Sequence, residues 1–184
     1  MKKILLGLFL LASSSAFSQM SEETKRHNRI GTELDVLPFA TGGYYFSAWY
    51  GWSKNQIRVR PVIAKVNVPD FAVDKNFQSN KIFAVALIAD YFLKPEFEGF
   101  WIGSGFEYWQ NSIENKSSVT ADYNAFVFTF GGGYVWKFYK DFYVNPWVSS
   151  HVLIGGDKVV KVGLETFKPQ LFTFEGSIKL GWSF

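Results

Sequence analysis

Apolar and polar residues alternate with a period of two along much of the chain, most clearly at its end. From Phe172 to Phe184 every second residue is apolar or glycine, and the residues between them are polar or small. A β-strand places successive side chains on opposite faces, whereas a helix would mix the two sets. The pattern therefore predicts a strand with one apolar and one polar face.

Eight segments alternate in this way, and each predicts one strand. They cover residues 30–38, 43–52, 56–67, 81–93, 97–110, 122–138, 142–154 and 170–184. Short turns near 53–55, 94–96 and 139–141 alternate with longer polar connections near 68–80, 111–121 and 155–169; the remaining connection, near 39–42, is short. With eight strands, the short turns fall at the end that carries both termini, as in outer-membrane barrels with short periplasmic turns and long outer loops.

The chain begins like an exported protein. Lys2 and Lys3 precede an apolar run from Ile4 to Ala12, and small residues follow up to Ser18. The run is too short to span a bilayer, and this order is typical of a cleaved secretory signal. We therefore expect a signal peptide at 1–18, a polar tail at 19–29 and a barrel domain at 30–184.

The location of the large rings favours a membrane barrel over a soluble one. Aromatic residues make up 20% of the chain, yet its mean hydropathy is only +0.01. The interior of an eight-stranded barrel is only just filled by side chains. Rings on the apolar face would overfill that interior but meet no such limit when they face lipid, and the opposite face is rich in glycine and serine. Rings expected near the periplasmic interface are Trp52, Tyr91, Phe97, Trp136, Phe142 and Trp182.

Composition excludes several other functions. The chain has no cysteine, so it has no disulfide or thiolate metal site, and its two histidines are far apart in sequence. Without Lys2 and Lys3 the net charge of +3 falls to 3 − 2 = +1, and no basic run indicates nucleic-acid binding. We therefore expect no metal, no cofactor and no nucleic-acid partner.

The final strand, which ends Lys179-Leu-Gly-Trp-Ser-Phe184, resembles the last strand of the small OmpA/OmpX-type outer-membrane barrels. The resemblance covers the architecture of residues 30–184. It implies an eight-stranded, antiparallel, up-and-down transmembrane barrel in a Gram-negative outer membrane. It also implies that Phe184 and Trp182 are read by the barrel-assembly machinery during biogenesis.

Strand parity directs a set of charged residues into the barrel, where unpaired charges are costly. This expected interior network consists of Glu33, Asp35, Arg58, Arg60, Asp90, Glu107, Lys137, Glu175 and Lys179. Acids and bases nearly balance, so we expect them to pair across strands and to plug the barrel. A pore would favour one dominant sign of charge.

A catalytic alternative centres on His151. If Phe142 lies opposite Phe184, His151 falls opposite Glu175 and Ser149 opposite Ser177, which brings together a serine, a histidine and a carboxylate. Small-barrel deacylases instead carry a His-x-Ser pair on a lipid-facing strand, a pattern that is absent here. A paired interior histidine is the simpler interpretation.

The sequence thus favours a non-enzymatic outer-membrane barrel with a structural or surface-binding role and outer-membrane lipid around it. The alternatives are a lipid A or phospholipid-modifying enzyme that uses His151, and a narrow channel. Apolar residues in the outer connections could contact an extracellular ligand: Phe71, Phe77, Val159, Val160 and Leu164.

Overall fold

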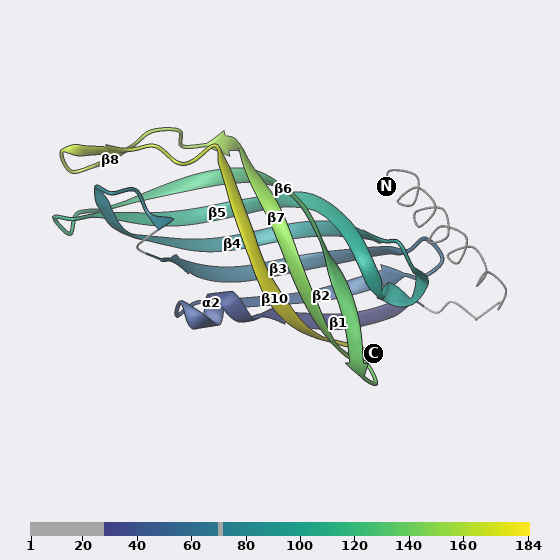
Figure 1. Ribbon diagram of the computed structural model, residues 1–184. Helices are drawn as coiled ribbons and strands as arrows, with labels where there is room; N and C mark the ends of the chain where they lie inside the picture. The colour runs from purple at the N-terminus through teal and green to yellow at the C-terminus, as the bar shows by residue number, and fades with distance from the viewer. Residues whose placement is uncertain (1–27, 70–71) are drawn as a thin grey trace, which may run out of the picture.

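The computed structural model describes residues 28–69 and 72–184; the expected signal peptide and all but the last two residues of the expected tail lie outside this part. The described residues form a closed, antiparallel, eight-stranded barrel in which consecutive strands pair and the last closes on the first (Figure 1). Its strands are β1 (Arg29–Asp35), β2 (Tyr44–Trp52), β3 (Ile57–Val68), β4 (Phe77–Phe92), β5 (Gly99–Asn115), β6 (Thr120–Tyr139), β7 (Phe142–Gly156) and β10 (Phe172–Ser183). The predicted fold class is confirmed.

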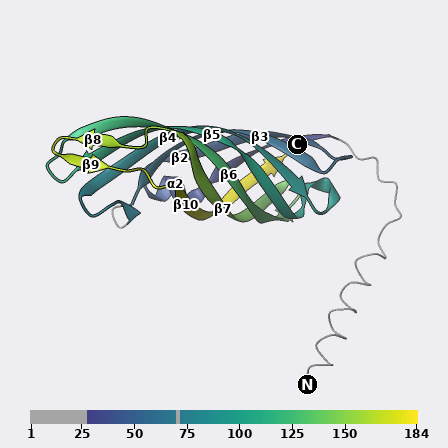
Figure 2. The same ribbon diagram turned by 90° about the horizontal axis from the view of Figure 1, so that it is seen from above.

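The two ends of the barrel differ. Tight connections join β2 to β3, β4 to β5 through the short helix η2 (Pro95–Phe97), and β6 to β7, at the end that carries the C-terminus (Figures 1 and 2). We call this the turn end. Helix α2 (Val36–Ala40) and the hairpin of β8 (Val160–Val162) and β9 (Glu165–Phe167) lie at the opposite, loop end. Within the described residues no helix is long and apolar enough to cross a membrane.

All three connections expected to be long polar loops are partly strand. In the connection near 68–80, β4 already begins at Phe77. β5 runs on to Asn115, and Glu114 pairs with Thr120 of β6, so the connection predicted near 111–121 shrinks to four residues, 116–119. The connection at 155–169 contains the β8–β9 hairpin. Apolar side chains stabilise this extension, since the hairpin and the barrel strands share a buried cluster that comprises Phe77, Ile113, Tyr123, Val160, Val162 and Phe167.

The first strand ends at Asp35, three residues earlier than predicted. The Asp35 carboxylate accepts a hydrogen bond from the backbone N–H of Leu37 at 3.1 Å and so caps the N-terminus of α2. The chain therefore turns into a helix where β1 would otherwise have continued alongside β10.

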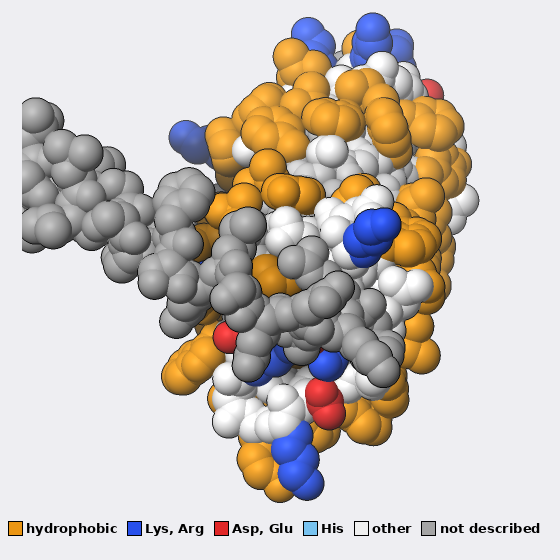
Figure 3. All heavy atoms as spheres, turned by 90° about the vertical axis from the view of Figure 1, so that its right-hand side faces the viewer, with side chains coloured by type: hydrophobic (Ala, Val, Ile, Leu, Met, Phe, Trp, Pro, Cys, Tyr) orange, Lys and Arg blue, Asp and Glu red, His pale blue; other side chains and the backbone are white. Residues whose placement is uncertain are grey.

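Large apolar side chains cover the outside of the barrel. Phe100, Phe106 and Phe174 are 62%, 63% and 78% exposed, and Figure 3 shows hydrophobic side chains gathered over the flank visible from the turn end. Phe97 is an exception to the predicted interfacial rings, because it is only 3% exposed and packs inside the barrel against Phe92 and Trp49.

Candidate functional site

Aromatic rings fill the interior near the turn end, which the volume argument from sequence did not anticipate. The buried cluster there comprises Trp49, Phe92, Phe97, Trp101, Val135 and Tyr143. Inward glycines make room for these rings: a Cβ at Gly51 would collide with Phe97, and one at Gly181 would collide with Tyr143. The two-residue alternation could have predicted these inward rings, because Trp49 and Trp101 lie two residues before the inward-facing Gly51 and Gly103 and therefore on the same face.

A compact group of buried charges lies next to this ring cluster. Arg58 contacts Glu33 (Nη1–Oε1, 2.9 Å) and Asp90 (Nε–Oδ2, 2.8 Å). Arg60 contacts Asp90 through Nε (2.6 Å) and Nη2 (3.0 Å) and approaches Glu33 at 3.5 Å. All four side chains are at most 4% exposed, so this part of the expected network is brought together as a buried cluster.

Neutral side chains add hydrogen bonds to this central charge cluster, although Arg58 Nη2 is buried without a hydrogen-bond partner among the described residues. Glu33 accepts hydrogen bonds from the Tyr143 hydroxyl (3.0 Å) and the Asn145 amide (3.1 Å). The Trp101 indole N–H donates to Asn145 at 2.9 Å, which links the charges to the ring cluster. Such additional hydrogen bonds offset part of the cost of burying the charges.

Asp35 and Lys179 extend the charge cluster toward the loop end. Asp35 accepts hydrogen bonds from Ser177 (2.5 Å) and from the Trp147 indole N–H (2.6 Å). The Lys179 Nζ lies 3.7 Å from the centre of the Trp147 ring, a cation–π contact. The cluster then holds three carboxylates and three cations, Glu33, Asp35 and Asp90 with Arg58, Arg60 and Lys179, so its formal charges balance.

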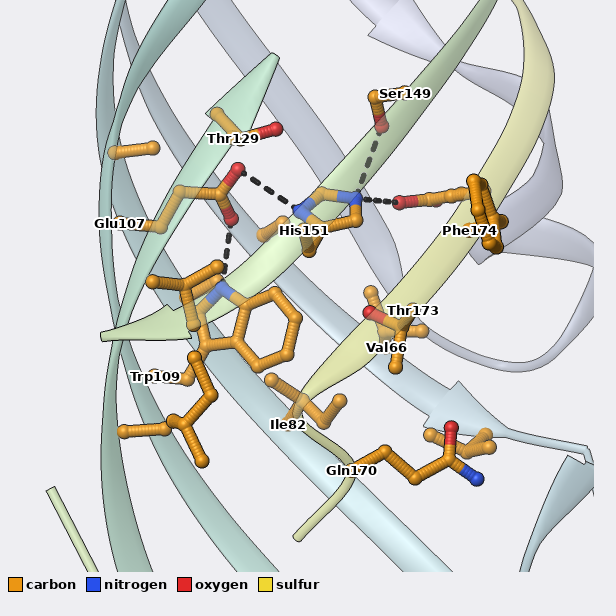
Figure 4. Close-up of a pocket in the computed structure, with 18 of the residues that line it drawn as sticks. Val66, Ile82, Glu107, Trp109, Thr129, Ser149, His151, Gln170, Thr173 and Phe174 are labelled. Carbon is orange, nitrogen blue, oxygen red and sulfur yellow. Dashed lines mark hydrogen bonds and ion pairs between the residues drawn. The ribbon is translucent and has the colours of Figure 1, made fainter. Parts of the chain in front are cut away.

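The other expected members of the network lie elsewhere. Glu107 and Glu175 belong to a second group around His151 (Figure 4): His151 Nδ1 is 3.4 Å from Glu107 Oε1, and Nε2 is 3.4 Å from Glu175 Oε2. Lys137 lies near the turn end, where its Nζ donates to the backbone carbonyl of Glu96 at 2.9 Å. The residues predicted to form a single network therefore form two separate interior groups, and Lys137 lies apart from both at the rim.

The strand register around His151 differs by two residues from the prediction. Phe142 pairs with Trp182 rather than Phe184, so His151 lies opposite Thr173, and Ser149 lies opposite Glu175. The predicted trio nevertheless meets, because Glu175 reaches diagonally to His151 and the Ser149 Oγ lies 2.9 Å from Nε2. A glutamate side chain is long enough to bridge the diagonal neighbour positions of a sheet.

The arrangement is a poor nucleophilic site. Glu107, His151 and Ser149 follow the order of a catalytic triad, but the nitrogen that would take the serine proton also faces Glu175. Backbone N–H groups beside Ser149 take part in pairing with β6 and β10, and so are not directed at an oxyanion. Across residues 28–69 and 72–184, no group of histidine and acidic residues could hold a metal ion.

A cavity of about 630 Å³ occupies the loop-end half of the interior, within the size range of small-molecule sites. Its floor includes Arg60, Trp101, Trp147 and Lys179, and the His151 group lies on one wall. The wall from β3 and β4 is apolar: Val62, Ala64, Val66, Ile82, Ala84 and Ala86. Sequence analysis did not predict this cavity.

The apolar residues expected in the outer loops divide into two sets. Val159 is 57% exposed and Leu164 at the hairpin tip is fully exposed, whereas Phe77 of β4 and Val160 of the hairpin are buried in the apolar cluster between them. Phe71 lies outside the described residues.

Comparison with solved structures identifies the architecture. The N-terminal β-barrel domain of Pseudomonas aeruginosa OprF matches with a TM-score of 0.52 at 11% identity, covering 85% of this chain and 96% of that one. The chain has the fold of the small eight-stranded outer-membrane barrels. Neisserial surface protein A also matches, with a TM-score of 0.49 at 10% identity over 85% of this chain and 92% of that one. No protein-family model matches the sequence, and a search of curated proteins gives no match.

Proposed function

We propose that this small outer-membrane barrel is a non-enzymatic protein of a Gram-negative outer membrane, exported by a cleaved signal peptide, with a structural or surface-binding role. The observation that supports this proposal most directly is the contrast between the outer and the inner face of the barrel wall. Large exposed rings such as Phe106 and Phe174 suit contact with lipid, while the charges inside are buried and paired. A closed barrel leaves no strand backbone exposed in the bilayer core except where its wall is interrupted.

The side chains inside the barrel favour a closed interior rather than a channel. The ring cluster and the central charge cluster follow one another along the axis at the turn end, and Arg58 and Asp90 are each 1% exposed. Ions crossing here would have to displace several charge-assisted hydrogen bonds at once. The loop-end cavity is therefore a site for binding from the outer side.

Planar bilayers that contain the refolded protein should show no ion conductance steps, because the paired charges and rings leave no continuous aqueous path. The matched comparison is Arg60→Glu, which places a third carboxylate beside Glu33 and Asp90. Stable steps in the unmodified protein, with a selectivity that changes in Arg60→Glu, would establish the channel instead.

Surface labelling tests location and assembly together. Because the chain has no cysteine, an introduced cysteine is the only thiol in this protein that can react. On intact cells, a membrane-impermeant maleimide should label Lys161→Cys in the exposed hairpin, but should label Lys54→Cys at the turn end only after the cells are broken. Adding Phe184→Ala to Lys161→Cys should remove most of the labelling, because we propose that the assembly machinery reads Phe184 and, with it, Trp182.

The control for that loss is refolding in vitro. Phe184 is 55% exposed and its backbone N–H bonds to Ile30 at 2.8 Å, a contact that alanine keeps. Phe184→Ala should therefore refold normally in detergent. Equal surface labelling of Lys161→Cys with and without Phe184→Ala would contradict the assembly role of Phe184. Labelling of Lys54→Cys on intact cells would show that the turn end faces outward, contrary to the proposed orientation.

A further inference from the structure

The wall of the barrel is incomplete on one side of β10. β10 pairs with β7 along its length, from Phe172 to Trp182, but its pairing with β1 stops at Lys179, opposite Asp35. Residues 172–178 of β10 therefore have no strand beside them on the β1 side within the described part of the chain.

The free edge of β10 presents backbone groups to this gap. The N–H of Phe184 bonds to Ile30 of β1, and hydrogen bonding alternates from side to side along an antiparallel strand. Even-numbered residues of β10 thus direct their backbone groups toward β1. At Phe174 and Gly176 those groups face a position where no strand pairs with them among the described residues.

Helix α2 lies across the gap in place of a strand. It packs against β10, β2 and β3. Asp35 fixes the turn-end limit of the gap, since its carboxylate caps α2 at Leu37 and accepts a hydrogen bond from Ser177 of β10. Beyond this point α2 and β10 approach each other without a backbone ladder.

The cavity extends to this gap. Leu37 and Pro38 of α2 line the cavity from one side, and Phe174 and Gly176 of β10 line it from the other. Phe174 also belongs to the outer face, where it is 78% exposed. Because no strand pairs with this stretch of β10 on the β1 side among the described residues, these lining residues place the cavity beside the interruption in the wall.

This opening lies at a depth occupied by lipid chains. Phe174 precedes Trp182 of the expected interfacial ring by eight residues along β10. At about 3.3 Å per residue and a tilt of about 40°, this separation is roughly 20 Å along the membrane normal, within an apolar band about 25 Å tall. The exposed side chains beside the opening are apolar as well, with Leu37 at 42% and Phe39 at 52%.

We propose that an acyl chain of a membrane lipid enters the barrel sideways between α2 and β10 and lies in the cavity against the apolar wall of β3 and β4. Figure 4 shows Val66 and Ile82 of that wall directed into the same space as His151. The inference rests on the proposed membrane location. It names the ligand as a lipid chain taken from the bilayer itself, so that the cavity is filled from the side as well as from the loop end.

Tryptophan quenching tests the proposal directly. Trp109 lines the cavity. Its fluorescence is obtained by subtracting the emission of Trp109→Phe from the emission of the unmodified protein. The full chain is refolded into phosphatidylcholine vesicles with brominated acyl chains, which quench tryptophan on contact. We expect Trp109 emission to be lost in these vesicles and retained in vesicles without bromine.

Two variants should restore Trp109 emission in the brominated vesicles. Ala84→Phe fills the cavity from its apolar wall. Gly176→Phe adds a ring to the outer face of β10 at the edge of the opening, where the new Cβ would lie against Val148. Ala89→Phe is the matched control, because Ala89 lies on the same strand as Ala84 but is exposed on the outer face, and it should leave the quenching unchanged.

The possible results separate this inference from the proposed function. Quenching that persists in both Ala84→Phe and Gly176→Phe would mean that bromine acts through the wall, and would overturn the proposal. So would an unquenched Trp109 beside quenched Trp136 and Trp182, a result that leaves the membrane barrel standing. If the outward-facing tryptophans also escape quenching, the chain does not lie in the bilayer and the proposed function fails as well.

Discussion

Replacing Glu33 by alanine should lower the free energy of unfolding by about 3–5 kcal/mol, the usual cost of removing one partner from a buried ion pair. The Glu33 side chain is 0% exposed and accepts hydrogen bonds from Arg58, Tyr143 and Asn145. Its loss leaves Asp90 as the one carboxylate in contact with Arg58 and Arg60, whose side chains are at most 4% exposed. Urea unfolding of the protein refolded in vesicles measures the change.

Glu175→Ala is the matched control for this prediction. The Glu175 side chain is 32% exposed and makes an ion pair with His151 at 3.4 Å. A partly exposed pair contributes only about 0–1 kcal/mol, so Glu175→Ala should unfold almost like the unmodified protein. Equal losses for the two glutamates would mean that the central charge cluster is not the dominant polar contribution to stability.

Gly181→Ala should destabilise the barrel by about 1–3 kcal/mol, the usual cost of overpacking a filled interior. A Cβ at Gly181 would collide with the Tyr143 ring, whose hydroxyl donates to Glu33 and accepts from Trp49. The ring cannot move away without breaking hydrogen bonds to a buried carboxylate. The same urea unfolding measurement reports the loss.

The comparison for Gly181 is Gly155→Ala, at the loop end of β7. A Cβ there would meet Phe126 at 3.5 Å, an ordinary van der Waals contact, and should cost little. A tolerated Gly181→Ala would show that the Tyr143 ring has room to shift, and that the ring cluster is packed more loosely than its burial indicates.

The aromatic rings inside the barrel show where the prediction from side-chain volume was incomplete. Period-two alternation correctly directed large rings such as Phe106 outward, but it treated inward glycines as a uniformly small lining. In the folded barrel Gly51 lies beside Phe97 and Gly181 beside Tyr143, so that small and large residues alternate around the interior. Such pairing joins residues far apart in sequence, and only the strand register reveals it.

The prediction for the His151 group was correct in spite of an error in the strand register. The prediction paired Phe142 with Phe184, whereas the barrel pairs it with Trp182. A shift of two residues keeps every side chain on its face, so the prediction that Ser149, His151 and Glu175 share an inward surface does not depend on the error. Glu107, the second carboxylate on His151, comes from β5, and the alternation pattern could not pair it with β7.

The sequence by itself determined which segments become strands, which face of each is apolar and at which end the short turns lie. These properties are local, since they follow from the two-residue period of a strand and from the residues that form turns. The tertiary structure alone decided the register and the separation of the interior charges into two groups. It also decided the early end of β1 at Asp35, which leaves residues 172–178 of β10 without a strand on the β1 side within the described part of the chain. The reason is that hydrogen bonds between strands and closure of the ring join residues distant in sequence, and alternation carries no information about which distant residues meet.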